Sequence, residues 1–155
     1  MTITSYQQAV KYLEGFIGKI IFKVDYESIK KRDPLERMRI FLSLLGNPQD
    51  KFKSVLVGGT SGKGSTSYLI SHILTDANYK TGLTLSPHLQ KVNERLQING
   101  QSISDKNFTK MVASMIRIIE TMKKTKVGVP SYFEILIGMA FAYFAKEKVD
   151  IVVVE

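Results

Sequence analysis

The spacing of apolar residues predicts two helices in the N-terminal third of the chain. Between residues 5 and 16 apolar side chains recur at helical spacing, and Ser5 can cap the first turn. A second helix is predicted between Asp33, a capping residue followed by Pro34, and Gly46, which suits the position after a helix. Its predicted apolar face consists of Leu35, Met38, Phe41, Leu42 and Leu45.

From residue 54 onward, strand patterns and helix patterns alternate. The Ile/Val run at 151–154 predicts a central strand of a parallel sheet, apolar on both faces. Strands separated by helices are typical of an α/β fold with a mostly parallel sheet and flanking helices. The predicted elements, in order, are a strand at 54–57, a helix with Tyr68, Leu69, Ile73 and Leu74 as its buried face, a strand at 81–85, a hairpin at 94–98 turning at Asn99-Gly100, helices at 104–122 and 130–144, and the strand at 151–154.

Composition narrows the classes of function. The 155 residues contain no cysteine, which excludes disulfides and thiolate chemistry, and only two histidines, His72 and His88. The net charge of +8 favours anionic ligands such as nucleotides or polycarboxylates, but the basic residues are too dispersed to predict a nucleic-acid surface. No apolar run approaches the roughly 20 residues that span a bilayer. We therefore expect a soluble, cytoplasmic protein.

The segment from Gly59 to Thr66 carries the clearest chemical signal. It follows the predicted strand at 54–57 and precedes a helix. Glycines let the backbone approach an anion closely, and amide groups at a helix start bind phosphate oxygens. Lys63 would reach the outer phosphates, and the Ser65 hydroxyl would bind the accompanying magnesium. The predicted phosphate loop consists of Gly59, Thr60, Ser61, Gly62, Lys63, Gly64, Ser65 and Thr66.

This loop departs from the usual phosphate-binding pattern G-x-x-x-x-G-K-[ST]. Gly64 separates Lys63 from Ser65, and Val57 stands where the first glycine is usual. An ordinary glycine-rich turn with a solvated lysine is the simpler structural explanation. However, a G-x-x-G-K-x-[ST] pattern arises by chance in fewer than about one in a hundred chains of this length. Nucleotide binding is the favoured interpretation.

The loop and the segments around it resemble the folylpolyglutamate synthase and dihydrofolate synthase family, within the Mur-type ATP-dependent amide ligases. Residues 59–65 are similar to the family's G-T-N-G-K-G-S, with Ser61 in place of asparagine. The glycine loop alone would indicate only the wider ligase group, but the further matches occur in family order and cover nearly the whole chain. They are Leu45–Gln49, Ser86–Leu89 as S-P-H-L, Asn93–Arg95 as N-E-R, Tyr132–Glu134 and Val149–Glu155.

The resemblance implies a P-loop-containing α/β domain of the Mur ligase central type and a two-step reaction. ATP phosphorylates a carboxylate of folate or dihydropteroate, and the amine of L-glutamate then attacks the acyl phosphate to form an amide. It gives Lys63 a catalytic role at the ATP phosphates. It also implies that Ser86 and Glu155 bind Mg²⁺ beside Ser65. Without the resemblance, Ser86 would be read as a turn residue before Pro87.

The resemblance further implies a site for pteroate or folate. Simpler roles remain open for its members: His88 as a loop histidine, Glu94 and Arg95 as an exposed hairpin pair, and the segment 131–134 as a helix cap with core aromatics. The implied substrate residues are His88, Arg95, Ser131, Tyr132, Phe133, Glu134, Gly18, Lys19, Ile20 and Ile21.

Family members continue beyond the position of Glu155, so we expect residues 1–155 to be the N-terminal part of the ATP-binding ligase domain. The rest of that domain and a C-terminal glutamate-ligase domain would then be absent, leaving little ligase activity. The alternatives are a nucleotide-binding module and another P-loop NTPase. We expect a monomer that binds ATP, Mg²⁺, L-glutamate and folate or dihydropteroate, but neither nucleic acid nor membrane. Whether it adds the first glutamate, extends the tail or does both stays open.

Overall fold

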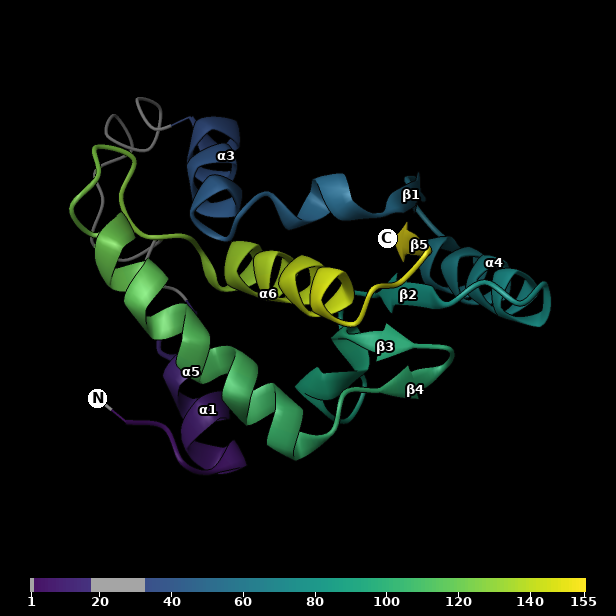
Figure 1. Cartoon of the computed structure of the whole chain (residues 1–155), viewed down its shortest axis with the longest axis horizontal. Coiled ribbons are helices and arrows are strands. Elements are labelled where there is room, and N and C mark those ends of the chain that lie inside the picture. The colour runs from purple at the N-terminus through teal and green to yellow at the C-terminus, as the bar shows by residue number, and fades with distance from the viewer. Residues whose placement is uncertain (1, 18–32) are drawn as a thin grey trace. The chain divides into compact units, whose positions relative to one another are not determined.

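The computed structural model describes residues 2–17 and 33–155, which form two compact units (Figure 1). The first unit comprises Met1–Asn47 and Lys106–Met139, and the second comprises Pro48–Asp105 and Ala140–Glu155. The predicted substrate residues Gly18, Lys19, Ile20 and Ile21 lie outside the described residues. No helix in the described part of the chain is long and apolar enough to cross a membrane.

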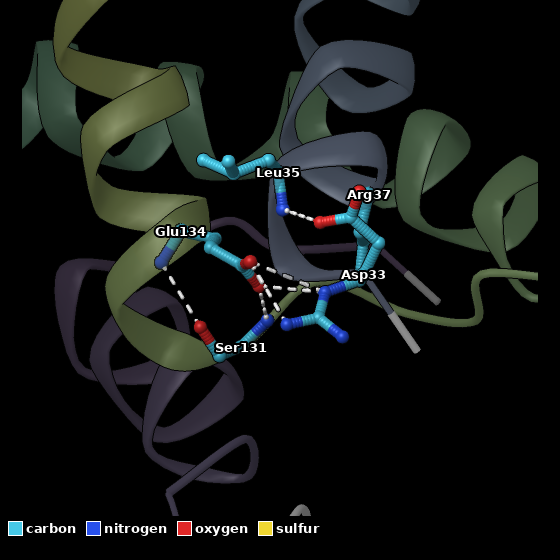
Figure 2. A network of polar contacts seen from close by, with 5 residues as sticks. All are labelled: Asp33, Leu35, Arg37, Ser131 and Glu134. Carbon is cyan, nitrogen blue, oxygen red and sulfur yellow. Dashed lines mark hydrogen bonds and ion pairs between the residues drawn. The ribbon is translucent and has the colours of Figure 1, made fainter. Parts of the chain in front are cut away.

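The first unit is built from helices, two of which begin at capping residues that the sequence predicted. They are α1 (Tyr6–Glu14), α3 (Pro34–Leu44), most of α5 (Asp105–Met122) and the first half of α6 (Tyr132–Lys146). Ser5 caps α1 by accepting a hydrogen bond from the Gln8 amide, and the Gln8 side chain accepts one from the Ser5 amide in return. Asp33 caps α3 through a 2.8 Å hydrogen bond from the Leu35 amide (Figure 2). Both predicted caps are confirmed.

The predicted apolar face of α3 is partly wrong. Phe41 is fully buried, but Leu35 is 67% exposed, whereas the charged Arg37 is buried. Phe41 packs against α6 at Gly138, where a β-carbon would overlap the Phe41 ring. Arg37 is buried because a carboxylate on α6 pairs with it, a contact that helical periodicity cannot predict. The rest of the unit's fully buried core includes Leu13, Phe108, Met115, Ile119, Met122, Ile135 and Met139.

The second unit contains a five-stranded, mostly parallel sheet in the order β1-β5-β2-β3-β4. The strands are β1 (Lys53–Leu56), β2 (Thr81–Thr84), β3 (Gln97–Ile98), β4 (Gln101–Ser102) and β5 (Ile151–Val154). β5 lies between β1 and β2 and is parallel to both, while β3 and β4 pair antiparallel. Val152 and Val153 are fully buried. The mostly parallel α/β sheet and its central Ile/Val strand are therefore confirmed.

Helices and short 3₁₀ turns complete the second unit. α4 (Lys63–Asp76) packs on β2 and β5. In the second half of α6, Phe144 packs against Gly82 of β2, where a β-carbon would lie 3.1 Å from the ring. This close approach explains why β2 carries a glycine at that position. Two 3₁₀ helices, η1 (Pro48–Lys51) and η2 (Val92–Arg95), precede β1 and β3.

Two predictions in this unit are wrong in their details. On α4 the buried residues are the small Ser67 and Ser71, while Tyr68, Leu69 and Ile73 are 47%, 62% and 67% exposed. Small side chains let the helix lie close to the sheet, so the larger ones point elsewhere. The predicted hairpin strand at 94–98 is only two residues long, because residues 92–95 form η2. Its turn at Asn99-Gly100 is confirmed, with φ of 49° and 73°.

Candidate active site

The phosphate loop ends at an open helix N-terminus. Gly62 is the N-cap of α4 in a left-handed conformation, with φ 73°, and no side chain caps it. A residue with a β-carbon is strained at this φ, which explains the glycine. The first intrahelical hydrogen bond runs from the Thr66 amide to the Gly62 carbonyl at 3.0 Å. The amides of the first turn, from Lys63 to Ser65, therefore remain available to an anion.

The glycine that interrupts the usual motif lies beside a carboxylate. A β-carbon at Gly64 would lie 4.0 Å from Oε2 of Glu155, so a longer side chain there would extend toward that oxygen. Glycine keeps this approach open. Gly64, the residue that departs from the usual motif, thus lies where the N-terminus of α4 meets the carboxyl end of β5.

Ser86 and Glu155 meet beyond the carboxyl ends of two adjacent parallel strands. The Glu155 amide donates to the Thr84 carbonyl at 3.1 Å, which continues the pairing of β5 with β2. The Ser86 amide donates to Oε2 of Glu155 at 2.7 Å. Carboxyl ends of parallel strands are where α/β folds place their ligands. The structure therefore brings together two residues separated by 69 positions that the resemblance had paired.

These residues line one end of a cavity of about 580 Å³. The polar end contains Gly64, Ser65, Ser86 and Glu155. Apolar side chains make up much of the rest of the lining, and two of them, Tyr68 and Leu69, are large side chains of α4 that do not pack on the sheet. The apolar lining residues are Tyr68, Leu69, Leu85, Pro87 and Leu89, and Glu94 and Gln97 also line the cavity. This volume and mixture of surfaces are typical of a small-molecule site.

The polar end of the cavity offers oxygen donors of the kind that Mg²⁺ prefers. Glu155 supplies a carboxylate, and Ser65 and Ser86 supply hydroxyl groups. Among residues 2–17 and 33–155, no group of three or more His, Cys, Asp or Glu side chains is placed to hold a metal ion. A cation beside Glu155 would draw on that carboxylate, on hydroxyl groups and on oxygens of its ligand, a donor set that suits magnesium bound to phosphates.

The loop from Ser86 to Arg95 borders the cavity and is held by side-chain contacts. Nε of Arg95 donates to Nδ1 of His88 at 3.0 Å, so these two predicted substrate residues contact each other. Glu94 and Arg95 lie half-buried in η2 and not in a hairpin strand, and the Glu94 carboxylate accepts three backbone amides. Those hydrogen bonds, that of Leu89 foremost, hold the pKa of Glu94 below its ordinary value. The N-E-R match had placed Glu94 near the implied substrate site, but Glu94 was not among the implied substrate residues.

The predicted substrate segment 131–134 belongs to the first unit and begins α6 (Figure 2). The Ser131 hydroxyl accepts the Glu134 amide at 3.2 Å, and the Glu134 carboxylate accepts the Ser131 amide at 2.7 Å. This reciprocal pair is a capping box, so Ser131 and Glu134 act as a helix cap, as the simpler alternative for this segment proposed. Phe133 is 48% exposed, and Tyr132 is half-buried.

Arg37 completes this network and was not predicted. Its Nε lies 2.9 Å from Oε2 of Glu134, and its Nη2 lies 2.9 Å from Oε1, a two-pronged pairing of guanidinium and carboxylate. The two side chains are 11% and 13% exposed. The residues are 97 positions apart, so no local pattern could have indicated the pair. Its consequence is that the Glu134 carboxylate is already fully engaged within the protein.

Comparison with characterised proteins gives consistent relatives across nearly the whole chain, although no protein-family model matches it. The chain is 37% identical over 153 residues to the dihydrofolate synthase/folylpolyglutamate synthase of Bacillus subtilis, covering 98% of this chain and 33% of that protein. It is 40% identical over 159 residues to the mitochondrial folylpolyglutamate synthase of Homo sapiens, covering 97% of this chain and 27% of that protein. The chain thus spans about a third or less of these relatives.

Solved structures give the same result. The folylpolyglutamate synthase of Thermotoga maritima superposes with a TM-score of 0.82 at 36% identity, covering 97% of this chain and 32% of that one. A Mycobacterium tuberculosis folylpolyglutamate synthase complexed with ADP gives 0.83 at 31% identity, with coverages of 97% and 31%. A complex of such an enzyme with AMPPCP and folate gives 0.82 at 28% identity, with coverages of 97% and 34%.

Proposed function

Because the chain belongs to the folylpolyglutamate synthase and dihydrofolate synthase family, we propose that it provides the phosphate-binding part of an ATP-dependent ligase. The reaction is the joining of L-glutamate to a carboxylate of folate or dihydropteroate through an acyl phosphate. The observation that carries the proposal is the meeting of the α4 N-terminus, Ser86 and Glu155 at one end of a single cavity. A phosphoryl transfer between two anions needs such a concentration of amide donors, cations and metal-binding oxygens.

In this proposal each residue at the polar end has one task. The amides of the first turn of α4 bind phosphate oxygens, and Lys63 neutralises charge on the outer phosphates. Glu155, Ser86 and Ser65 hold the magnesium ion that accompanies the nucleotide. Bound Mg·ATP supplies the phosphoryl group that activates the substrate carboxylate. Relatives of the same fold have been solved with ADP, and with AMPPCP and folate, which supports nucleotide and folate as ligand classes.

For the substrate side we propose a division of tasks within the segment 131–134. The exposed part of Phe133 and the neighbouring Tyr132 contact the pteroate or folate, while Ser131 and Glu134 fix the start of α6. The commitment of Glu134 to Arg37 supports this division, since an engaged carboxylate has little capacity left for a ligand. His88 and Arg95 are proposed to act as a contacting pair beside the cavity.

A second candidate is a nucleotide-binding module without ligase activity. The observation that favours it is that the chain spans only about a third of the relatives it matches. For the chain by itself, we expect little or no ligase turnover.

A chimera separates the two candidates. The 155 residues replace the matching third of the Bacillus subtilis relative, and ADP release is measured with ATP, Mg²⁺, glutamate and either dihydropteroate or folate. The ligase proposal predicts substrate-dependent ADP release that Lys63→Ala abolishes and that Lys51→Ala, at an exposed position on η1, leaves unchanged. A chimera that folds, as judged by circular dichroism, but releases no ADP while the unaltered relative does would contradict the proposal. The preferred acceptor indicates which glutamate is added.

A further inference from the structure

The carboxylate of Glu94 gathers three consecutive backbone amides of the loop beside the cavity. Its Oε2 accepts the Leu89 amide at 2.7 Å, and its Oε1 accepts the amides of Gln90 and Lys91 at 3.0 and 2.8 Å. The Glu94 amide in turn donates to the Lys91 carbonyl at 3.0 Å. One side chain therefore fixes a stretch of backbone that has no strand or helix of its own.

These contacts exceed what capping the short helix η2 requires. A capping carboxylate satisfies the amide just before its helix, here that of Lys91. The amides of Leu89 and Gln90 lie further upstream, in the loop proper. Hydrogen bonds from amides to a charged carboxylate are among the stronger ones in proteins. Glu94 therefore determines the path of the loop as well as the start of η2.

The other end of the loop is held by the proposed metal ligand. The Ser86 amide donates to Glu155, and Glu94 holds the backbone from Leu89 to Lys91, so two carboxylates fix the loop on either side of His88. Arg95, next to Glu94, donates to His88 between these anchors. Behind Glu94, the Asn93 side chain donates to the Ile103 carbonyl at 2.7 Å, which ties η2 to the segment after β4. This hydrogen bond therefore helps to hold η2, the helix that carries Glu94, in place.

We propose that Glu94 is a positioning residue that holds the Ser86–Lys91 loop in place, so that the Ser86 hydroxyl and the Leu89 side chain are presented to the cavity. The role in catalysis rests on the proposed function, in which Ser86 helps to hold magnesium. Glu94 itself contacts no reacting atom in this account. Its contribution passes through the backbone that it binds.

The first test measures the loop directly in the 155-residue chain, without any ligand. Amide hydrogen exchange is followed by NMR in the wild type, Glu94→Gln, Glu94→Asp and the control Glu147→Gln, whose half-exposed carboxylate lies 4.0 Å from Lys80. Loss of charge and of one acceptor oxygen should accelerate exchange at Leu89, Gln90 and Lys91 by about tenfold or more, with other amides unchanged. Glu94→Asp should recover part of the protection. Unchanged exchange at these three amides in Glu94→Gln overturns the proposal.

The second test measures the magnesium dependence of nucleotide binding by calorimetry, with AMPPCP as the probe. Glu94→Gln should reduce the gain in affinity that Mg²⁺ gives the wild type by about tenfold, because Ser86 is misplaced, while the affinity for metal-free AMPPCP stays the same. A residue needed only for folding would weaken both affinities together, and that outcome overturns the positioning role. If the wild type binds no AMPPCP, the proposed function fails, whereas the exchange measurement still decides whether Glu94 holds the loop.

Discussion

Removing the positive charge of Arg37 tests whether the pair with Glu134 is structural. Arg37→Met keeps most of the aliphatic stem but leaves the Glu134 carboxylate, only 13% exposed, without its cation. Breaking one partner of a buried ion pair costs about 3–5 kcal/mol of unfolding free energy. The Ser131 amide still binds Glu134 in the variant, so we expect a loss near the lower end, about 3 kcal/mol.

The assay is urea unfolding followed by circular dichroism, which compares midpoints and slopes of the variants. Lys123→Ala is the control, because it removes an ion pair with Glu120 whose side chains are 54% and 53% exposed. Such a surface pair contributes about 0–1 kcal/mol. Replacing both partners, as Arg37→Met with Glu134→Leu, should recover most of the stability, since no uncompensated charge remains. A single-variant loss as small as that of the control would refute the structural role. A double variant no better than the single would show that packing, not charge, dominates.

Two further predictions concern the phosphate loop and the loop beside it. Gly62→Ala should lower the free energy of unfolding by about 1 kcal/mol and weaken AMPPCP binding in calorimetry. The reason is backbone strain, because a residue with a β-carbon is unfavourable at φ 73°, although no atom lies within 4 Å of the added carbon. Full affinity of the variant for AMPPCP would contradict the left-handed cap. The Leu89 amide shift, followed by NMR during an acid titration, should have a midpoint below the ordinary Glu value of 4.5, because the backbone amides hold the pKa of Glu94 down. The hydrogen bonds from the loop amides to the ionised Glu94 therefore contribute fully above pH 4.5 and are lost as the pH falls through the lowered pKa. A titration midpoint at or above 4.5 would show that the amides do not lower this pKa.

Features that depend on near neighbours in the chain were predictable from the sequence. Ser5 and Asp33 cap their helices because a capping residue and the amides that it binds lie within a few positions of each other. The Ile/Val run of β5 indicated a strand buried on both faces, which the sheet order confirms. The meeting of Ser86 with Glu155 followed from the resemblance, not from any local pattern.

The errors came from contacts that the chain makes over long distances. Periodicity located the α4 helix but could not tell whether the sheet would contact Tyr68 and Leu69 or the small Ser67 and Ser71. Arg37 was not predicted as a buried residue, because its partner lies 97 positions away. The role of Glu94 was hidden for another reason: its partners are backbone amides, which every residue offers, so side-chain identities carry no sign of the contact.

The central claim, that the glycine loop binds the phosphates of a nucleotide, is tested most directly by calorimetry of the chain with Mg·AMPPCP. Binding by the wild type that is lost in Lys63→Ala and retained in Lys51→Ala is the result the account predicts. Equal affinities of the wild type and Lys63→Ala for Mg·AMPPCP would contradict it.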